Sequence, residues 1–125
     1  IKRTTGASGF ASRESTQRSL QVAMPPQQPV ATVLYPVMRD EPTPRFTALA
    51  GGRAVKIESR QGTDIVLLAL ERFTYRGEGV EFEGKAGAVQ IRSGQPRLSL
   101  PCAGKLRHGG KSLENRSGGD RTVSK

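Results

Sequence analysis

Short runs of alternating hydrophobic and polar residues dominate the chain between Lys56 and Leu100. Successive side chains of an extended strand point to opposite faces, so this alternation predicts strands with one buried face. No stretch shows the 3.6-residue apolar period of an amphipathic helix. The pattern therefore predicts an all-β fold, an antiparallel sandwich or barrel. Of these two we favour the antiparallel β-sandwich of jelly-roll-like form, with flexible basic termini. The alternating apolar pairs are Val55 and Ile57, Phe73 and Tyr75, Val80 and Phe82, Val89 and Ile91, and Leu98 and Leu100.

Glycine-rich segments separate the expected strands. Gly77-Glu78-Gly79, Gly84-Lys85-Ala86-Gly87 and Ser93-Gly94-Gln95-Pro96 are interpreted as turns, because glycine adopts the backbone conformations that tight turns need. His108-Gly109-Gly110 is expected to close a last hairpin between two short basic strands. Residues 65–70 are apolar on both faces and are expected to form the most buried strand.

The alternation also assigns faces. In the strand at residues 53–58, Val55 and Ile57 are expected on one face, and Lys56 and Glu58 on the other, polar face. The aromatic residues at positions 46, 73, 75 and 82 are all expected to point inward. Inward rings cannot stack on nucleic-acid bases, which is how single strands are usually held.

The chain divides into three segments on this reading. Residues 1–28 are expected to be a linker or a partly ordered N-terminal segment, because they hold few large apolar groups. Residues 29–114 form the β-sandwich domain, which fits the usual size of one domain. Residues 115–125, rich in glycine, serine and charge, are expected to be a disordered tail.

The net charge of +9 at first indicates an anionic partner such as nucleic acid. Seven of these charges, however, lie in residues 1–20 and 103–125, and residues 21–102 carry only +2. The excess charge therefore belongs mainly to the ends of the chain. Nucleic acid is accordingly the less favoured partner.

Candidate chemistry is sparse. The chain has one cysteine, Cys102, and one histidine, His108, so it can form neither an internal disulfide nor a cysteine–histidine metal set. Cys102 is interpreted as a small buried residue at a strand end, and His108 as an exposed turn residue. Glu78, Glu81 and Glu83 could form an acid–base cluster, but a solvated face beside Arg76 and Lys85 is favoured. We expect no metal and no cofactor.

No segment indicates a membrane anchor or a leader. The longest apolar run, residues 65–70, is far shorter than the roughly 20 residues that cross a bilayer. The first residues, Ile1-Lys2-Arg3, are not followed by the apolar stretch of a signal peptide. Because the chain begins with isoleucine, we expect a fragment or a processed product.

Three groups of residues between Thr32 and Glu114, over about two-thirds of the chain, form a recognisable order of strand and turn motifs. They are Thr32-Val33-Leu34-Tyr35-Pro36 with Ala54-Val55-Lys56-Ile57, Phe73-Thr74-Tyr75 with the run from Gly79 to Arg92, and the run from Gly104 to Glu114. None of them is a catalytic signature. In this order they resemble the C-terminal β-sandwich domain of heparinase II/III-like polysaccharide lyases.

The resemblance implies a multidomain, bacterial parent whose catalytic residues lie in a helical toroid outside this chain. Such proteins cleave acidic polysaccharides by β-elimination. The resemblance thus implies a non-catalytic accessory β-sandwich domain that packs on the catalytic domain of the same parent. It also implies a periplasmic or secreted location.

A direct role in binding acidic polysaccharide would need basic residues on polar strand faces. The candidates are Lys56, Arg76, Lys85, Arg92 and Arg97. No catalytic residue is expected within the chain, and no membrane partner. The alternative hypothesis is a basic all-β module that binds nucleic acid, with an affinity that falls steeply as salt rises.

Overall fold

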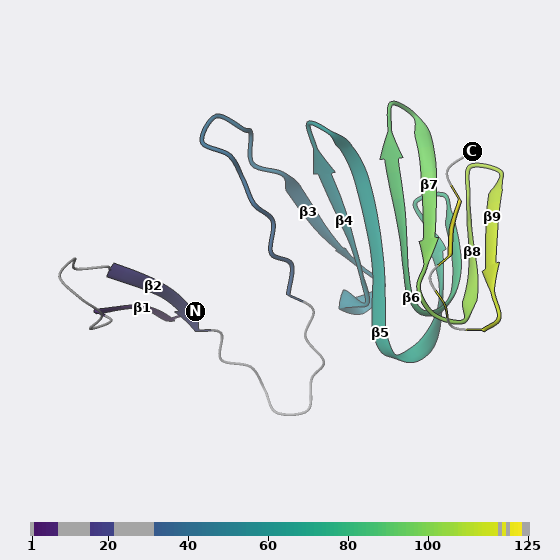
Figure 1. The fold of residues 1–125 in the computed structure, drawn as a ribbon, viewed down its shortest axis with the longest axis horizontal. Helices are drawn as coiled ribbons and strands as arrows, with labels where there is room; N and C mark the ends of the chain where they lie inside the picture. The colour runs from purple at the N-terminus through teal and green to yellow at the C-terminus, as the bar shows by residue number, and fades with distance from the viewer. Residues whose placement is uncertain (1, 8–15, 22–31, 118, 120, 124–125) are drawn as a thin grey trace.

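A computed structural model describes residues 2–7, 16–21, 32–117, 119 and 121–123. It confirms the all-β class, because eight strands form one antiparallel sheet (Figure 1). A short 3-10 turn, η1 (Ala50–Gly52), follows the first of them. The strands are β3 (Arg45–Leu49), β4 (Ala54–Ser59), β5 (Gly62–Gly77), β6 (Val80–Arg92), β7 (Gln95–Leu100), β8 (Gly104–His108), β9 (Lys111–Asn115) and β10 (Arg121–Val123).

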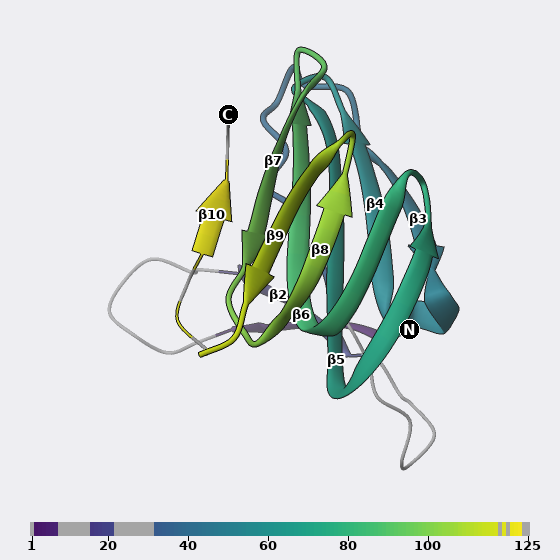
Figure 2. The same ribbon diagram turned by 90° about the vertical axis from the view of Figure 1, so that its right-hand side faces the viewer.

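One long hairpin, β5–β6, divides the sheet into two layers. Residues 88–92 of β6 pair with β7, whereas residues 80–83 pair with β8. Layer one contains β3, β4, the first half of β5, the second half of β6, β7 and β10. Layer two contains the remaining halves of β5 and β6 with β8 and β9. Figures 1 and 2 show layer two folded over one face of layer one. The strand order is simpler than the double Greek key of a jelly roll, because each strand from β3 to β7 pairs with the next.

The hairpin bends where its register shifts. Residues 69–72 of β5 lie opposite the single residue Lys85 of β6. The expected turn at residues 84–87 is therefore wrong, since these residues lie inside one continuous strand. Glycine is needed there because the Phe82 ring lies over the strand: a Cβ at Gly87 would lie 2.9 Å from the ring. The expectation that residues 65–70 form the most buried strand fails at Leu68 and Leu70, which are exposed, although Ile65 and Leu67 are buried.

The core fills the space between the two layers. Layer one contributes a row of buried side chains that pair across β5, β6 and β7 at Ile65, Val89 and Leu98. Layer two contributes Phe82 and its neighbours on β8 and β9. Burial of these apolar side chains is the main stabilising contribution to the fold. The cluster consists of Ala54, Ile65, Leu67, Phe73, Val80, Phe82, Val89, Leu98, Leu100, Leu106 and Leu113.

Three of the expected turns are confirmed as two-residue hairpin loops. The loops are Glu78-Gly79, Ser93-Gly94 and Gly109-Gly110, and all six residues have positive φ. Positive φ at both loop positions gives a turn whose twist matches that of the paired strands. The glycine-rich segments of the sequence therefore predicted these three turns correctly.

The two ends of the chain contain more strand than expected. At the N-terminus, β1 (Lys2–Ala7) and β2 (Thr16–Gln21) form a separate two-stranded antiparallel sheet within the segment expected to be a linker or partly ordered. At the C-terminus, residues 121–123 pair with β7 instead of being disordered. The expected domain boundary at residues 28 and 29 lies outside the described residues.

Candidate functional site

The five basic residues proposed from the sequence do not form one site. Two of them are held in ion pairs within the fold, and three are exposed at separate places. Arg76 lies on the outer face of layer two, and Lys85 lies at the bend of the long hairpin. Arg97 lies on β7, opposite Gln90 of β6. A groove lined by all five cations is therefore absent from the described part of the chain.

Lys56 lies on the face opposite to the one expected. Its register partner on β5 is the core residue Ile65, so its side chain is on the inner face of layer one. From there Nζ reaches the turn of layer two and donates a 2.8 Å hydrogen bond to Oε2 of Glu78. A second carboxylate, Glu58, lies 3.4 Å away. The hydrogen bond to Glu78 raises the pKa of Lys56, so this lysine links the two layers as a cation.

Arg92 is held by the edge of layer one. Its Nη2 donates to both carboxylate oxygens of Asp64, at 2.7 and 2.8 Å, and its Nη1 donates to the Thr63 carbonyl at 3.3 Å. The hydrogen bonds to Asp64 raise the pKa of the guanidinium further above its ordinary value. These several hydrogen bonds hold the Arg92 side chain in one position. Its positive charge is already neutralised within the fold.

The outer face of layer two carries alternating charges. Arg76, Glu81 and Arg107 are register partners across β5, β6 and β8, and the Arg107–Glu81 ion pair measures 3.5 Å. Beside them Lys105 lies opposite Glu83, whose carboxylate accepts from Arg72 at 2.9 Å. A shallow hollow of about 160 Å³ lies among these residues. Mixed charges of this kind favour a solvated face over an anion-binding one.

The candidate catalytic groups are engaged elsewhere or stand alone. The three glutamates of the proposed cluster each pair with a different cation, as described above. His108 uses Nδ1 in a 3.0 Å contact with the Gly79 carbonyl, and Cys102 is a free, half-buried thiol. Within the described ranges, no group of three or more histidine, cysteine, aspartate or glutamate residues could hold a metal ion. The arrangement of these groups does not support acid–base or nucleophilic chemistry.

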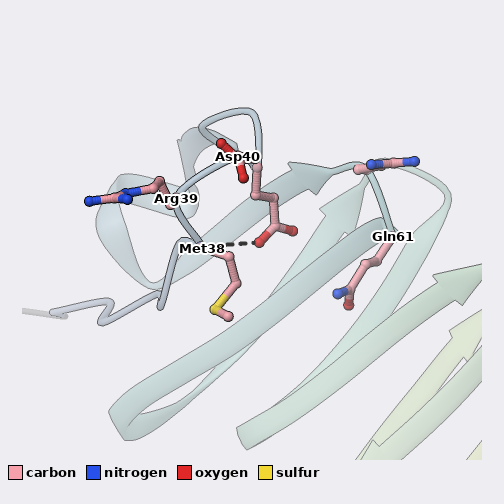
Figure 3. A pocket seen from close by; sticks show the side chains of 6 residues that line it. Met38, Arg39, Asp40 and Gln61 are labelled. Carbon is pink, nitrogen blue, oxygen red and sulfur yellow. Dashed lines mark hydrogen bonds between the residues drawn. The ribbon is translucent and has the colours of Figure 1, made fainter.

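An open hollow of about 640 Å³ lies beside the β4–β5 turn (Figure 3). The turn at residues 38–41 forms one side of it, and Arg60 and Gln61 form the other. The Glu41 carboxylate closes its own turn by accepting from the Met38 amide at 3.5 Å. This hollow contains neither a buried polar group nor a concentration of one charge, so it does not indicate a ligand.

The feature that sequence reasoning missed is an apolar outer face on layer one. Ile57 is 6% exposed but lies outside the core between the layers, because it points to the opposite side of β4. Its register partner Phe46, expected to point inward, is 45% exposed and packs against Tyr35 with ring centroids 6.1 Å apart. Leu68 is 57% exposed on the same face. We call this surface the outer apolar face; it consists of Phe46, Ala48, Val55, Ile57, Val66, Leu68, Ala86 and Ala88.

Comparison of the chain with protein-family models, curated proteins and solved structures finds no match. Among the described residues, none forms a helix that is long and apolar enough to cross a membrane.

Proposed function

We propose that this chain is a non-catalytic accessory β-sandwich domain of a polysaccharide-lyase-like protein, and that it packs on the catalytic domain of the same parent through the outer apolar face. The observation that carries the proposal is that layer one also has apolar residues on its outer side, across β3, β4 and the adjoining parts of β5 and β6. The polar residues Asp64, Arg92 and Arg97 border this apolar area on the same side. The inner side of layer one is covered by layer two. Sheets with two apolar faces normally have a layer packed on each.

The basic residues support a structural role better than a catalytic one. Lys56 joins the two layers and Arg92 braces an edge, so neither is free to bind a substrate. The exposed residues Arg76, Lys85 and Arg97 remain the candidates for contact with an acidic polysaccharide along the surface of the parent. Single exposed cations contribute little each, so such binding would be weak and dependent on salt.

The first test is the coding sequence immediately upstream of Ile1. The proposal expects a long helical segment there, and a start codon at this position would contradict it. The second test uses the parent protein with Leu68→Asp, and with Leu70→Asp as the matched control on the same strand. Leu68 belongs to the outer apolar face, whereas Leu70 lies in the bend and is 79% exposed. Only Leu68→Asp should lower the melting temperature of the parent. Equal effects would refute docking through this face.

Binding assays separate the polysaccharide role from the nucleic-acid alternative. The chain should release no unsaturated uronate from acidic polysaccharides when assayed alone. Neutralising Arg76, Lys85 and Arg97 together should weaken any retention on a uronate polymer. Retention on RNA or DNA that falls steeply with salt, without retention on uronate polymers, would favour the alternative.

A further inference from the structure

β3 forms one edge of layer one. On the described part of the chain, it pairs with β4 on one side and with no strand on the other. Its five residues follow β4 in unbroken register, without a bulge, a proline or a lysine. Sheet edges usually carry such features to prevent pairing with other chains. The opposite end of the strand order, β10, is by contrast only three residues long.

The sequence of β3 is complementary to itself in antiparallel pairing. If two copies meet about a two-fold axis at Thr47, Arg45 lies opposite Leu49 of the other copy, and Phe46 lies opposite Ala48. Arg45 is the only charged residue of the strand, and this register brings no like charges face to face. A two-fold arrangement of one surface with itself is the commonest form of protein dimer.

The same register would cover exposed apolar surface. Phe46 is 45% exposed beside this edge, and it would pack against Ala48 of the second copy. Ala48 already continues a row of register partners, Val55, Val66 and Ala88, across the outer apolar face. Pairing would extend the row of each copy, at its β3 end, by the Phe46 ring of the other copy. Backbone pairing and burial of the ring therefore act together.

We propose that the chain forms a two-fold dimer through antiparallel pairing of β3 with β3 of a second copy. Layer one then continues from one copy into the other. This inference goes beyond the accessory role, because it uses the edge of the sheet and does not depend on a catalytic domain. If a strand of a different protein occupied the edge instead, the wild-type chain would sediment as a monomer in the experiment below.

The test compares two double variants by sedimentation across a concentration series. In Phe46→Lys/Ala48→Lys, the register sets a lysine opposite a lysine twice. In Phe46→Lys/Ala48→Glu, the same two contacts become oppositely charged. The first variant should dimerise about thirtyfold more weakly than the second. Both changes lie at exposed positions, so circular dichroism should show the same fold for both. A monomeric wild-type chain, or equal dimerisation of the two variants, would overturn the proposal.

The register has its own readout. In a Cys102→Ser background, Thr47→Cys would bring two thiols directly opposite each other on the two-fold axis, within the Cα separation that a disulfide bridges. Oxidation should then yield a covalent dimer. Ala48→Cys is the matched control, because its counterpart would be Phe46, and it should cross-link far less. Equal cross-linking of the two would exclude this register, while the Leu68→Asp test of the accessory role would be unaffected.

Discussion

Replacing Asn115 should open the junction between β9 and β10. Asn115 is 2% exposed at the end of β9. Its Nδ2 donates to the Leu100 carbonyl at 2.9 Å and to the Gly119 carbonyl, and its Oδ1 accepts from the Ser117 amide at 3.2 Å. One side chain therefore ties β9 to β7 and shapes the loop that leads to β10. Alanine would leave at least three backbone groups without these partners.

The size of the effect follows from these contacts. Each hydrogen bond contributes about 1 kcal/mol net, so Asn115→Ala should lower the free energy of unfolding by about 3 kcal/mol. That is a large fraction of the roughly 5–15 kcal/mol that stabilises a typical domain. In a domain of this size it corresponds to a fall in melting temperature of about 15 °C. Chemical denaturation with urea measures the free energy directly.

Asn115→Asp sharpens the test through its pH dependence. A carboxylate cannot donate to the Leu100 and Gly119 carbonyls, and burial raises the pKa of the introduced acid. A raised pKa in the folded state means that stability falls as pH rises through and above the unfolded value of about 3.9. Asn115→Asp should therefore be less stable than Asn115→Ala at neutral pH, and the deficit should shrink on acidification. A deficit that stays constant with pH, or a neutral-pH stability equal to wild type, would refute the reasoning.

Three further predictions concern the backbone, the ion pairs and the surface. Gly104→Ala should lower the free energy of unfolding by about 2 kcal/mol or more, because the added Cβ would press on the backbone of the paired strand β6. Gly119→Ala is the control, because its Cβ would meet open space, and thermal melts should show a much smaller loss of stability. The pKa values of Lys56 and Tyr75 are raised above their ordinary values of 10.5 and 10.0. The stability that these two groups contribute is therefore complete below those ordinary values, and it is lost as pH rises through their pKa values in the folded state. Glu78→Gln should flatten this alkaline loss in pH-dependent melts, and an unchanged slope would contradict the layer-to-layer pair. Arg92→Ala should lower the free energy of unfolding by about 1 kcal/mol after solvent screening, and Arg97→Ala should lower it by less than about 0.5 kcal/mol. Urea titrations measure both, and equal losses would argue that the Arg92–Asp64 ion pair does not stabilise the fold.

The sequence was a good guide to local pairing. Positive-φ turns at Glu78-Gly79, Ser93-Gly94 and Gly109-Gly110 could be predicted, because loop chemistry depends on adjacent residues only. The core positions Val80, Phe82 and Val89 of β6, and Leu98 and Leu100 of β7, were also predicted correctly, since polar residues alternate with most of them. In these strands, the period alone distinguishes the core from the solvent.

Prediction failed where both faces of a strand carry apolar residues or where pairing is remote. Alternation in β4 shows that Val55 and Ile57 share a face, but not which face meets layer two. The register with Ile65 decides this, and it turns Lys56 inward. The glycines at 84 and 87 looked like a turn because glycine serves equally to bend a strand beneath an aromatic ring. β10 depends on pairing with residues 98–100, which its own short sequence cannot reveal.

The long hairpin also has a consequence for how the chain folds. β5 and β6 supply a strand pair to each layer and are joined by a two-residue loop. Pairing can therefore start with contacts close in sequence in layer two and continue along the same hairpin into layer one. Local contacts of this kind form early and speed folding. We expect the hairpin to nucleate the domain, with β4 and β7 adding to one half and β8 to the other. β10 has only three residues and follows the Asn115 contacts in the chain. We therefore expect it to be the last strand to join the sheet and the first to be released on unfolding.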